Sequence, residues 1–225
     1  MNNNWHTHAF YSMGCHMTVW LEIESDERAE QAFTMVVDAF EQAEQRMSRF
    51  RVASELSWLN TQSNRWAQLS PPMWNVIAKA FVLSAETGGL FDPTVHDALI
   101  AAGYERSFDD LNGHAASATI AVSLSERASV QLDPEQQAIY LPEGVRLDLG
   151  GIGKGFTAQT VVEWLSEWGP CLIDAGGDLT AGDAPSGLSG WPVGIAAPWT
   201  HEMPEQENMM RLWLANSSLA TSGVD

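Results

Sequence analysis

The sequence predicts an α+β protein, because stretches with the two-residue alternation of strands and stretches with helical spacing occur in separate runs. Residues 17–24 alternate apolar and polar side chains and are rich in strand-forming types. Between residues 26 and 50, apolar side chains recur at the spacing of a long amphipathic helix. Helical spacing returns at residues 156–168, after several short strand-like stretches. Such a mixture is typical of antiparallel strands accompanied by separate helices.

The helices of the first half are marked by residues suited to helix ends. Ser25 is a good N-cap for the long helix, and residues 54–60 predict a short helix. Ser70 and Pro71 open a third helix, because proline is tolerated in a first turn, where its missing N–H has no helical partner. Gly88 is a natural stop for that helix.

Short strands predominate in the second half. The predicted strands, which are separated by turn residues, are 118–122, 130–132, 138–141, 145–149, 172–173, 193–197 and 212–214. Residues 181–190 are rich in glycine, serine and proline and predict a loop. Because no fixed repeat and no clear linker divides the chain, we expect one domain over residues 1–225.

The chain is strongly acidic, and this limits its partners. It has 29 acidic and 11 basic residues in 225, a formal net charge of -18. Such a surface repels nucleic acid and anionic membranes over most of its area. It also repels phosphate groups, so a phosphate-containing ligand needs a local device such as a metal ion or backbone amides. Cys15 and Cys171 match no zinc spacing and are interpreted as two small buried side chains.

The N-terminal residues show no basic region followed by an apolar run, which a signal peptide would need. No apolar run is long enough to span a bilayer. We therefore expect a cytoplasmic protein for the chain as given, and a periplasmic or membrane-anchored one where a leader has been removed.

Four glycine-rich turns, each beside a carboxylate or a hydroxyl, are candidate binding segments. They are 87–94 (TGGLFDPT), 148–155 (DLGGIGKG), 174–178 (DAGGD) and 220–225 (ATSGVD). Glycine at such places allows positive φ and lets the backbone approach a ligand closely. Two of the carboxylates also fit a local role, since Asp92 suits a cap for a helix beginning near Val95 and Asp174 suits a turn former.

The turn at 148–155 is the most informative of the four. A predicted strand runs into Gly-Gly-Ile-Gly-Lys-Gly and then into a helix, so helix amides and Lys154 form a possible phosphate cradle. The turn is not a P-loop, because Gly155 follows the lysine where serine or threonine is required. It is not a Rossmann fingerprint either, because Phe156 replaces the third glycine. A plain strand-to-helix turn with a solvent-facing lysine remains the alternative.

In their order along the chain, these segments resemble the FAD:protein FMN transferase family, also called the ApbE family. The motifs that carry the resemblance are Met13-Gly14-Cys15, 47–50 (MSRF), 54–57 (SELS), Leu59-Asn60, 87–95 (TGGLFDPTV), 148–155 (DLGGIGKG), 174–179 (DAGGDL) and 220–223 (ATSG). One such turn is weak evidence, but together they extend over residues 13–223, nearly the whole chain.

The resemblance implies an α+β fold related to the tunnelling fold, and an enzyme that binds FAD and Mg²⁺. Members of the family transfer FMN from FAD to a threonine or serine hydroxyl of a target flavoprotein and release AMP, and some hydrolyse FAD. Carried over by position, the residues that would contact FAD are Met13, Phe50, Leu90, Phe91, Asp92, Asp148 and Lys154. Of these, residues 90–92 would line the adenosine site, and the carbonyl of Gly151 would be a Mg²⁺ ligand. No catalytic residue follows from the resemblance.

The sequence departs from the family pattern in several places. Cys15 replaces the usual threonine, Phe50 replaces the usual tyrosine, and Val224-Asp225 replaces Asp-Tyr. The family's later His-containing segment, and the aspartate and threonine that bind Mg²⁺ after it, are not among these 225 residues. We therefore expect a member that is truncated at its C-terminal end and lacks the closing strands of the fold. The alternative function is a non-catalytic protein that binds or carries FAD, or an inactive fragment.

Overall fold

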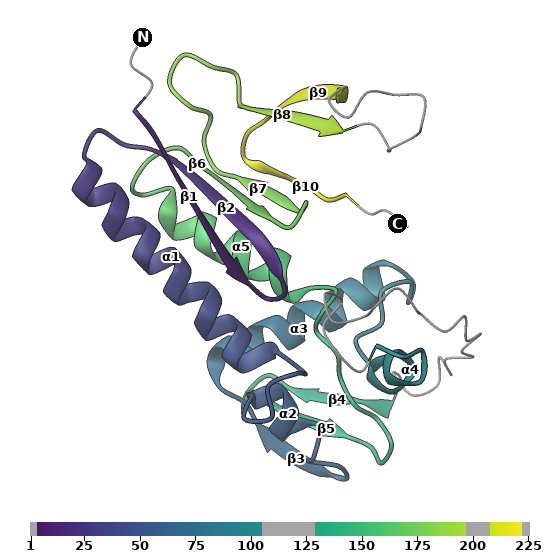
Figure 1. Ribbon diagram of the computed structural model, residues 1–225. Coiled ribbons are helices and arrows are strands. Elements are labelled where there is room, and N and C mark those ends of the chain that lie inside the picture. Colours follow the sequence, from purple (N-terminus) through teal and green to yellow (C-terminus); the bar gives the residue numbers. More distant parts are fainter. Residues whose placement is uncertain (1–3, 105–128, 197–207, 222–225) are drawn as a thin grey trace. The chain divides into compact units, whose positions relative to one another are not determined.

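The computed structural model describes residues 4–104, 129–196 and 208–221 (Figure 1). Within these residues the contacts divide the chain into two units. The first comprises the described parts of Met1–Tyr11, Cys15–Ala39 and Thr157–Asp225. The second comprises those of Ser12–Gly14 and Phe40–Phe156. The α+β class predicted from the sequence is confirmed, because strands and helices alternate irregularly and the assigned strand pairs are antiparallel.

A five-stranded sheet forms the centre of the first unit. Its strands, in spatial order, are β1 (Trp5–Ser12), β2 (Cys15–Glu22), β6 (Cys171–Ala175), β7 (Leu179–Ala181) and β10 (Ser217–Leu219). The predicted alternation in β2 is confirmed, because Met17, Val19 and Leu21 are fully buried. Val19 pairs with Ile173 of β6, so apolar side chains continue across the sheet.

Helices α1 (Asp26–Met47) and α5 (Gly153–Leu165) contribute apolar side chains to this unit. The predicted N-cap of α1 is confirmed, because the Ser25 hydroxyl accepts a hydrogen bond from the Arg28 amide at 3.3 Å. Phe33 of α1 stacks on His8 of β1, with the ring centroids 5.4 Å apart. A pair of antiparallel strands, β8 (Trp191–Ala196) and β9 (Asn208–Leu214), completes the described part of the unit.

The second unit is built on a three-stranded sheet and three helices. The strands, in spatial order, are β3 (Arg65–Gln68), β5 (Ala138–Leu141) and β4 (Gln131–Asp133), and the helices are α2 (Glu55–Leu59), α3 (Pro71–Glu86) and α4 (His96–Ala101). The short helix predicted at residues 54–60 is confirmed as α2, and Ser54 is its N-cap, because the Ser54 hydroxyl accepts from the Ser57 amide at 2.9 Å. One buried apolar cluster joins α2, α3 and β5 through side chains that include Leu59, Ile77 and Ile139.

The predicted strand at 145–149 is wrong, although its burial pattern is that of a strand. Val145, Leu147 and Leu149 are buried, but no strand pairs with them in the described chain. The Leu147 backbone is instead bonded by the Asn60 side chain. Oδ1 of Asn60 accepts from the Leu147 amide at 2.8 Å, and its Nδ2 donates to the Leu147 carbonyl at 2.9 Å. The predicted strand at 118–122 lies outside the described residues.

Within the described residues, no helix combines the length and the apolar character that a membrane span needs.

The two cysteines are not joined in a disulfide and differ in burial, so we expect them to differ in reactivity. Cys171 is buried in β6 and Cys15 is half-buried at the start of β2. Burial raises the pKa of the Cys171 thiol, although a hydrogen bond with Ser166 acts in the opposite direction. The thiolate is the reactive form, so an alkylating reagent at neutral pH should label Cys15 well before Cys171. Peptide mass spectrometry at successive times measures this, and equal rates for both thiols in folded protein would contradict it.

Candidate functional site

All eight residues assigned to FAD or metal by the resemblance belong to the second unit, although they come from four separate parts of the chain. Met13 lies in the two-residue turn between β1 and β2, and Phe50 follows the end of α1. Residues 90–92 follow α3, and residues 148–154 lead into α5. The second unit therefore contains every candidate FAD position.

Asp148 is held by a buried ion pair that the sequence did not indicate. Its Oδ2 accepts from Arg49 Nη1 at 2.9 Å, and the two side chains are only 8% and 13% exposed. The other oxygen, Oδ1, accepts from the Gly150 amide at 2.9 Å, which fixes the start of the glycine turn. An opposite charge and two hydrogen bonds are the conditions under which a buried carboxylate is tolerated.

Arg49 also connects two of the predicted FAD residues. Its guanidinium carbon lies 4.6 Å from the centroid of the Phe50 ring, in the geometry of a cation–π contact. Its Nη2 donates to the Tyr104 carbonyl at 3.0 Å. Arg49 thus contacts both Asp148 and Phe50, and only its place within the MSRF motif could have drawn attention to it.

Asp92 carries a buried oxygen without a partner. The residue is 9% exposed, and its Oδ1 accepts from both the amide and the hydroxyl of Thr94, at 2.9 and 2.7 Å. Its Oδ2 has no hydrogen-bond partner in the part of the chain that the structure describes. The local alternative, that Asp92 caps the next helix, is wrong, because Val95 is the N-cap of α4 and no side chain bonds there. A buried carboxylate oxygen of this kind requires a donor from outside the described residues.

The glycines of the turn at 148–155 allow an aromatic ring to lie close to the backbone. A Cβ atom added at Gly151 would lie 3.1 Å from Cε2 of Phe91, which is closer than ordinary packing allows. Phe91 itself packs against the buried cluster of the second unit. Leu90 differs from its neighbours, because its side chain is 94% exposed. Of the three predicted adenosine-site residues, two are therefore anchored in the fold and one projects into solvent.

Lys154 lies in the first turn of α5 and is half-buried. No acidic residue shares this first turn, and no described carboxylate forms an ion pair with the lysine. Two amides of this turn are already bonded, because Gly153 and Phe156 donate to the carbonyls of Leu149 and Ile152. The positive end of the helix dipole and the ammonium group still favour a negative charge there. The arrangement suits an anion, as the phosphate-cradle interpretation requires.

The Asp97 carboxylate links α4 to the chain just before Asp148. Its Oδ1 is 2.8 Å from His96 Nδ1 and 2.6 Å from Arg146 Nε. Burial acts to raise the pKa of Asp97, but the hydrogen bonds from His96 and Arg146 outweigh it, so the pKa lies below its ordinary value. A carboxyl with a lowered pKa stabilises the fold above its unfolded-state pKa, and this contribution is lost as the pH falls through the folded value.

The described residues do not form a metal site by themselves. No group of three or more His, Cys, Asp or Glu side chains is close enough to hold an ion in the described parts of the chain. Mg²⁺ takes near-octahedral oxygen ligands, and the carbonyl of Gly151 supplies only one. The residues described around Gly151 therefore do not fit a Mg²⁺ site without further ligands.

The turn at 174–178 lies in the first unit and contacts Thr221 of the turn at 220–225, whose residues 222–225 lie outside the described residues. The Asp174 Oδ1 accepts from the Gly177 amide at 2.7 Å, which confirms Asp174 as a turn former. The Thr221 hydroxyl donates to the Gly177 carbonyl at 2.9 Å. The DAGGD and ATSG motifs are thus joined directly, although 44 residues separate the bonded pair.

Comparison with known proteins identifies the family of the chain. The ApbE family model matches residues 13–225. The protein "FAD:protein FMN transferase" of Treponema pallidum (strain Nichols) is 27% identical over 211 residues, which is 87% of this chain but only 56% of that protein. The chain therefore spans little more than half the length of this curated relative.

Solved structures show the same fold. The apbe protein of Thermotoga maritima superposes with a TM-score of 0.78 at 20% identity, over 97% of this chain and 70% of that one. The apo form of the Pseudomonas stutzeri flavinyl transferase ApbE gives a TM-score of 0.76 at 19% identity, over 98% and 68%. The flavin transferase ApbE of Vibrio cholerae gives 0.75 at 20% identity, over 98% and 72%. With a family model that matches all but its first twelve residues, this chain belongs to the ApbE family.

Proposed function

We propose that this protein transfers FMN from FAD to a threonine or serine hydroxyl of a target flavoprotein and releases AMP. The observation that carries the proposal is the Asp92 oxygen, a buried acceptor without a described partner in a residue assigned to the adenosine site. The exocyclic amine of adenine is a hydrogen-bond donor and would satisfy this oxygen. A buried acceptor that stays unpaired costs about 1–3 kcal/mol, so a ligand that pairs with it is favoured.

The pyrophosphate of FAD would lie at the place where the chain favours a negative charge. The net charge of -18 disfavours an anionic ligand over most of the surface. Lys154 and the positive end of the α5 dipole provide the opposite preference at one place. Mg²⁺ bound here would take oxygens from the FAD pyrophosphate and from water, because the described residues contain no group of three or more His, Cys, Asp or Glu side chains that could hold it.

The proposed reaction replaces the phosphoanhydride bond of FAD by a phosphate ester bond to the acceptor hydroxyl. The acceptor hydroxyl oxygen forms a bond to the phosphorus of the FMN half, and the bond from that phosphorus to the bridging oxygen breaks. AMP leaves with the bridging oxygen, and the hydroxyl proton passes to solvent. The residues would act mainly by holding the pyrophosphate in place and by balancing the charge that develops on its oxygens.

Incubation with FAD, Mg²⁺ and an acceptor flavoprotein tests the proposal. Transfer gives a fluorescent acceptor band on a denaturing gel together with one AMP for each flavin attached. Binding of FAD without release of AMP would instead support the alternative of a non-catalytic flavin-binding protein. A chain that binds no FAD at all would contradict both functions.

Replacing Lys154 by alanine is expected to weaken FAD binding by about 1–3 kcal/mol, if the amine contacts a charged phosphate oxygen. Riboflavin lacks the pyrophosphate, so its binding should change much less. Titration of both flavins by fluorescence measures the difference. The matched control is Lys79→Ala, because Lys79 is an exposed lysine of α3 in the same unit. Equal losses of affinity for both flavins in Lys154→Ala would contradict a phosphate contact. Lys154 would then be interpreted as a solvated side chain.

A further inference from the structure

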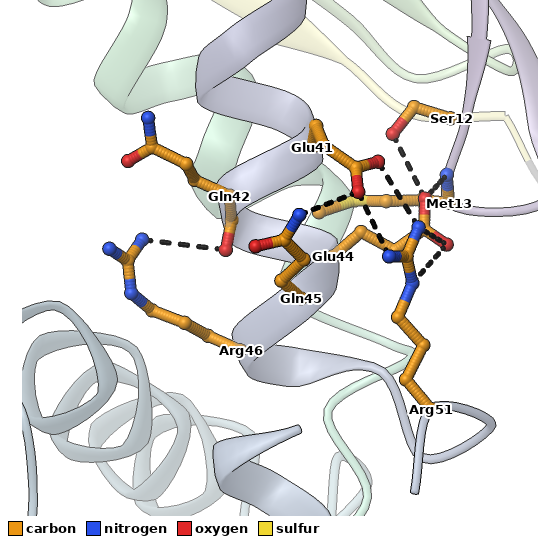
Figure 2. A network of polar contacts seen from close by, with 8 residues as sticks. All are labelled: Ser12, Met13, Glu41, Gln42, Glu44, Gln45, Arg46 and Arg51. Atoms are coloured by element: carbon orange, nitrogen blue, oxygen red, sulfur yellow. Dashed lines mark hydrogen bonds and ion pairs between the residues drawn. The ribbon is translucent and has the colours of Figure 1, made fainter. Parts of the chain in front are cut away.

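A network of polar contacts joins the end of α1 to two segments that carry predicted FAD residues (Figure 2). Its centre is the Glu44 carboxylate. One oxygen, Oε2, accepts from the Met13 amide at 2.7 Å and from the Ser12 hydroxyl at 3.1 Å. The other, Oε1, accepts from Nε and Nη2 of Arg51, at 3.1 and 3.0 Å. One carboxylate thus binds the turn that contains Met13 and the residue that follows Phe50.

The turn that Glu44 holds has an unusual residue in it. Met13 has a φ of 51° and Gly14 a φ of 74°, so both residues of this two-residue connection lie in the left-handed region. Hairpin turns of that kind favour asparagine, aspartate and glycine, because other side chains meet steric resistance there. Methionine is poorly suited to this conformation, so the turn needs support from outside. The bond from the Met13 amide to Glu44 is such a support, and it is strengthened by the charge of the acceptor.

Arg51 fixes the direction in which Glu44 points. Its guanidinium group binds Glu44 through two nitrogens and also binds both oxygens of Glu41, at 2.9 and 3.1 Å. The Glu44 side chain is 21% exposed and that of Glu41 is 46% exposed. An exposed ion pair such as Glu41–Arg51 contributes little. Glu44 is the more buried of the two acids and the one that accepts hydrogen bonds from the turn. Loss of Glu44 should therefore affect the turn more than loss of Glu41.

We propose that Glu44 is a positioning residue that holds Met13 in the conformation in which it contacts FAD. This inference rests on the function proposed above and adds a residue that the motif resemblance does not include. Glu44 touches no reacting atom in this scheme. It acts through the Met13 amide, and Arg51 keeps the carboxylate aligned.

Three variants of the chain separate this role from a general effect on the fold. Glu44→Ala removes the acceptor. Glu44→Gln keeps an oxygen that can accept from the Met13 amide but loses the charge. Glu41→Gln is the matched control, because Glu41 binds Arg51 whereas the Met13 amide donates to Glu44. Thermal unfolding is followed for all three, so that a variant that fails to fold is recognised. If Glu44→Ala does not fold, Glu44→Gln is used for the test instead.

Two measurements are made on each variant. Hydrogen exchange of the apo protein, read on a peptide that contains residues 12–15, reports whether the Met13 amide remains bonded. Titration with FAD, followed by the shift of the flavin absorption bands, reports affinity and flavin environment. We expect Glu44→Ala to exchange faster in this peptide and to bind FAD about tenfold more weakly, the effect of losing one charge-assisted hydrogen bond. Glu44→Gln should lie between it and the unmodified chain, and Glu41→Gln should match the unmodified chain in both measurements.

The outcomes are distinguishable. Unchanged exchange in folded Glu44→Ala would overturn the role of Glu44 in the turn. Faster exchange with unchanged FAD affinity would overturn its role in the site. An equal loss of affinity in Glu41→Gln would assign the effect to Arg51 and the network as a whole, and would also overturn the proposal. A failure of the unmodified chain to bind FAD contradicts the proposed function itself, while the exchange data still decide whether Glu44 holds the turn.

Discussion

Replacing Arg49 by methionine is expected to lower the free energy of unfolding by about 3–5 kcal/mol, because the Asp148 carboxylate would then be a buried charge without a partner. Methionine fills a similar volume, so the loss reflects charge and hydrogen bonding more than packing. The Tyr104 carbonyl would lose its donor in the same variant. Urea denaturation followed by circular dichroism measures the change, with the slope of the transition checked for two-state behaviour.

Two further variants make the Arg49 result interpretable. In the double variant Arg49→Met with Asp148→Asn, the buried charge is absent and an oxygen still accepts from the Gly150 amide, so most of the lost stability should return. Arg46→Met is the control for losing an arginine, since Arg46 is on the same part of the chain and makes one long hydrogen bond, 3.4 Å, to the Gln42 carbonyl. It should change stability by less than about 0.5 kcal/mol. A loss below about 1 kcal/mol in Arg49→Met would mean that water reaches the pair and screens it.

The elements that the sequence predicted best are those whose ends have local causes. Ser25 and Ser54 begin helices because their hydroxyls accept from amides three residues later, an interaction within one turn of chain. The strand predicted at 138–141 coincides with β5, whose residues are mostly buried. Such features depend on neighbours in sequence, and a pattern can therefore show them.

The missed elements depend on partners far away in the chain. β1 contains two histidines among its first four residues, and its sequence does not indicate what they contact. His6 Nε2 is 2.9 Å from the Ile23 carbonyl, and the His8 ring stacks on Phe33. Polar rings that find such partners are compatible with a half-buried strand, but the partner is not visible in the alternation of the strand itself. β3 and β10, of four and three residues, are too short for periodicity to be recognised.

The candidate site also has features that local sequence reveals and contacts that it does not. Its glycine turns were recognisable because glycine next to a carboxylate has a local meaning. The pairing of Arg49 with Asp148 spans 99 residues, and the bond from Met13 to Glu44 spans 31. Neither separation corresponds to any helical or strand period, so sequence reasoning found one member of each pair and missed the other. The buried oxygen of Asp92 was likewise beyond reach, because only burial distinguishes it from a surface turn former.

Asn60 provides the second large effect that we expect. Its side chain bonds both the amide and the carbonyl of Leu147, a residue whose side chain is fully buried. Asn60→Ala leaves a donor and an acceptor of the backbone without these partners, so the free energy of unfolding should fall by about 2–4 kcal/mol. The neighbouring variant Thr61→Ala is the control, because the Thr61 hydroxyl bonds only within the local turn, to the Trp58 carbonyl and the Gln62 side chain, and should cost less than about 1 kcal/mol.

Asn60→Asp separates the two bonds. Aspartate has nearly the same shape and still accepts from the Leu147 amide, but its ionised form cannot donate to the Leu147 carbonyl and places a negative charge against it. At neutral pH this variant should therefore be at least as unstable as Asn60→Ala. Protonation supplies the missing donor, so the difference in stability from the unmodified chain should shrink as the pH is lowered, which urea denaturation at several pH values measures. A difference that stays constant with pH would show that the bond to the Leu147 carbonyl contributes nothing measurable to stability.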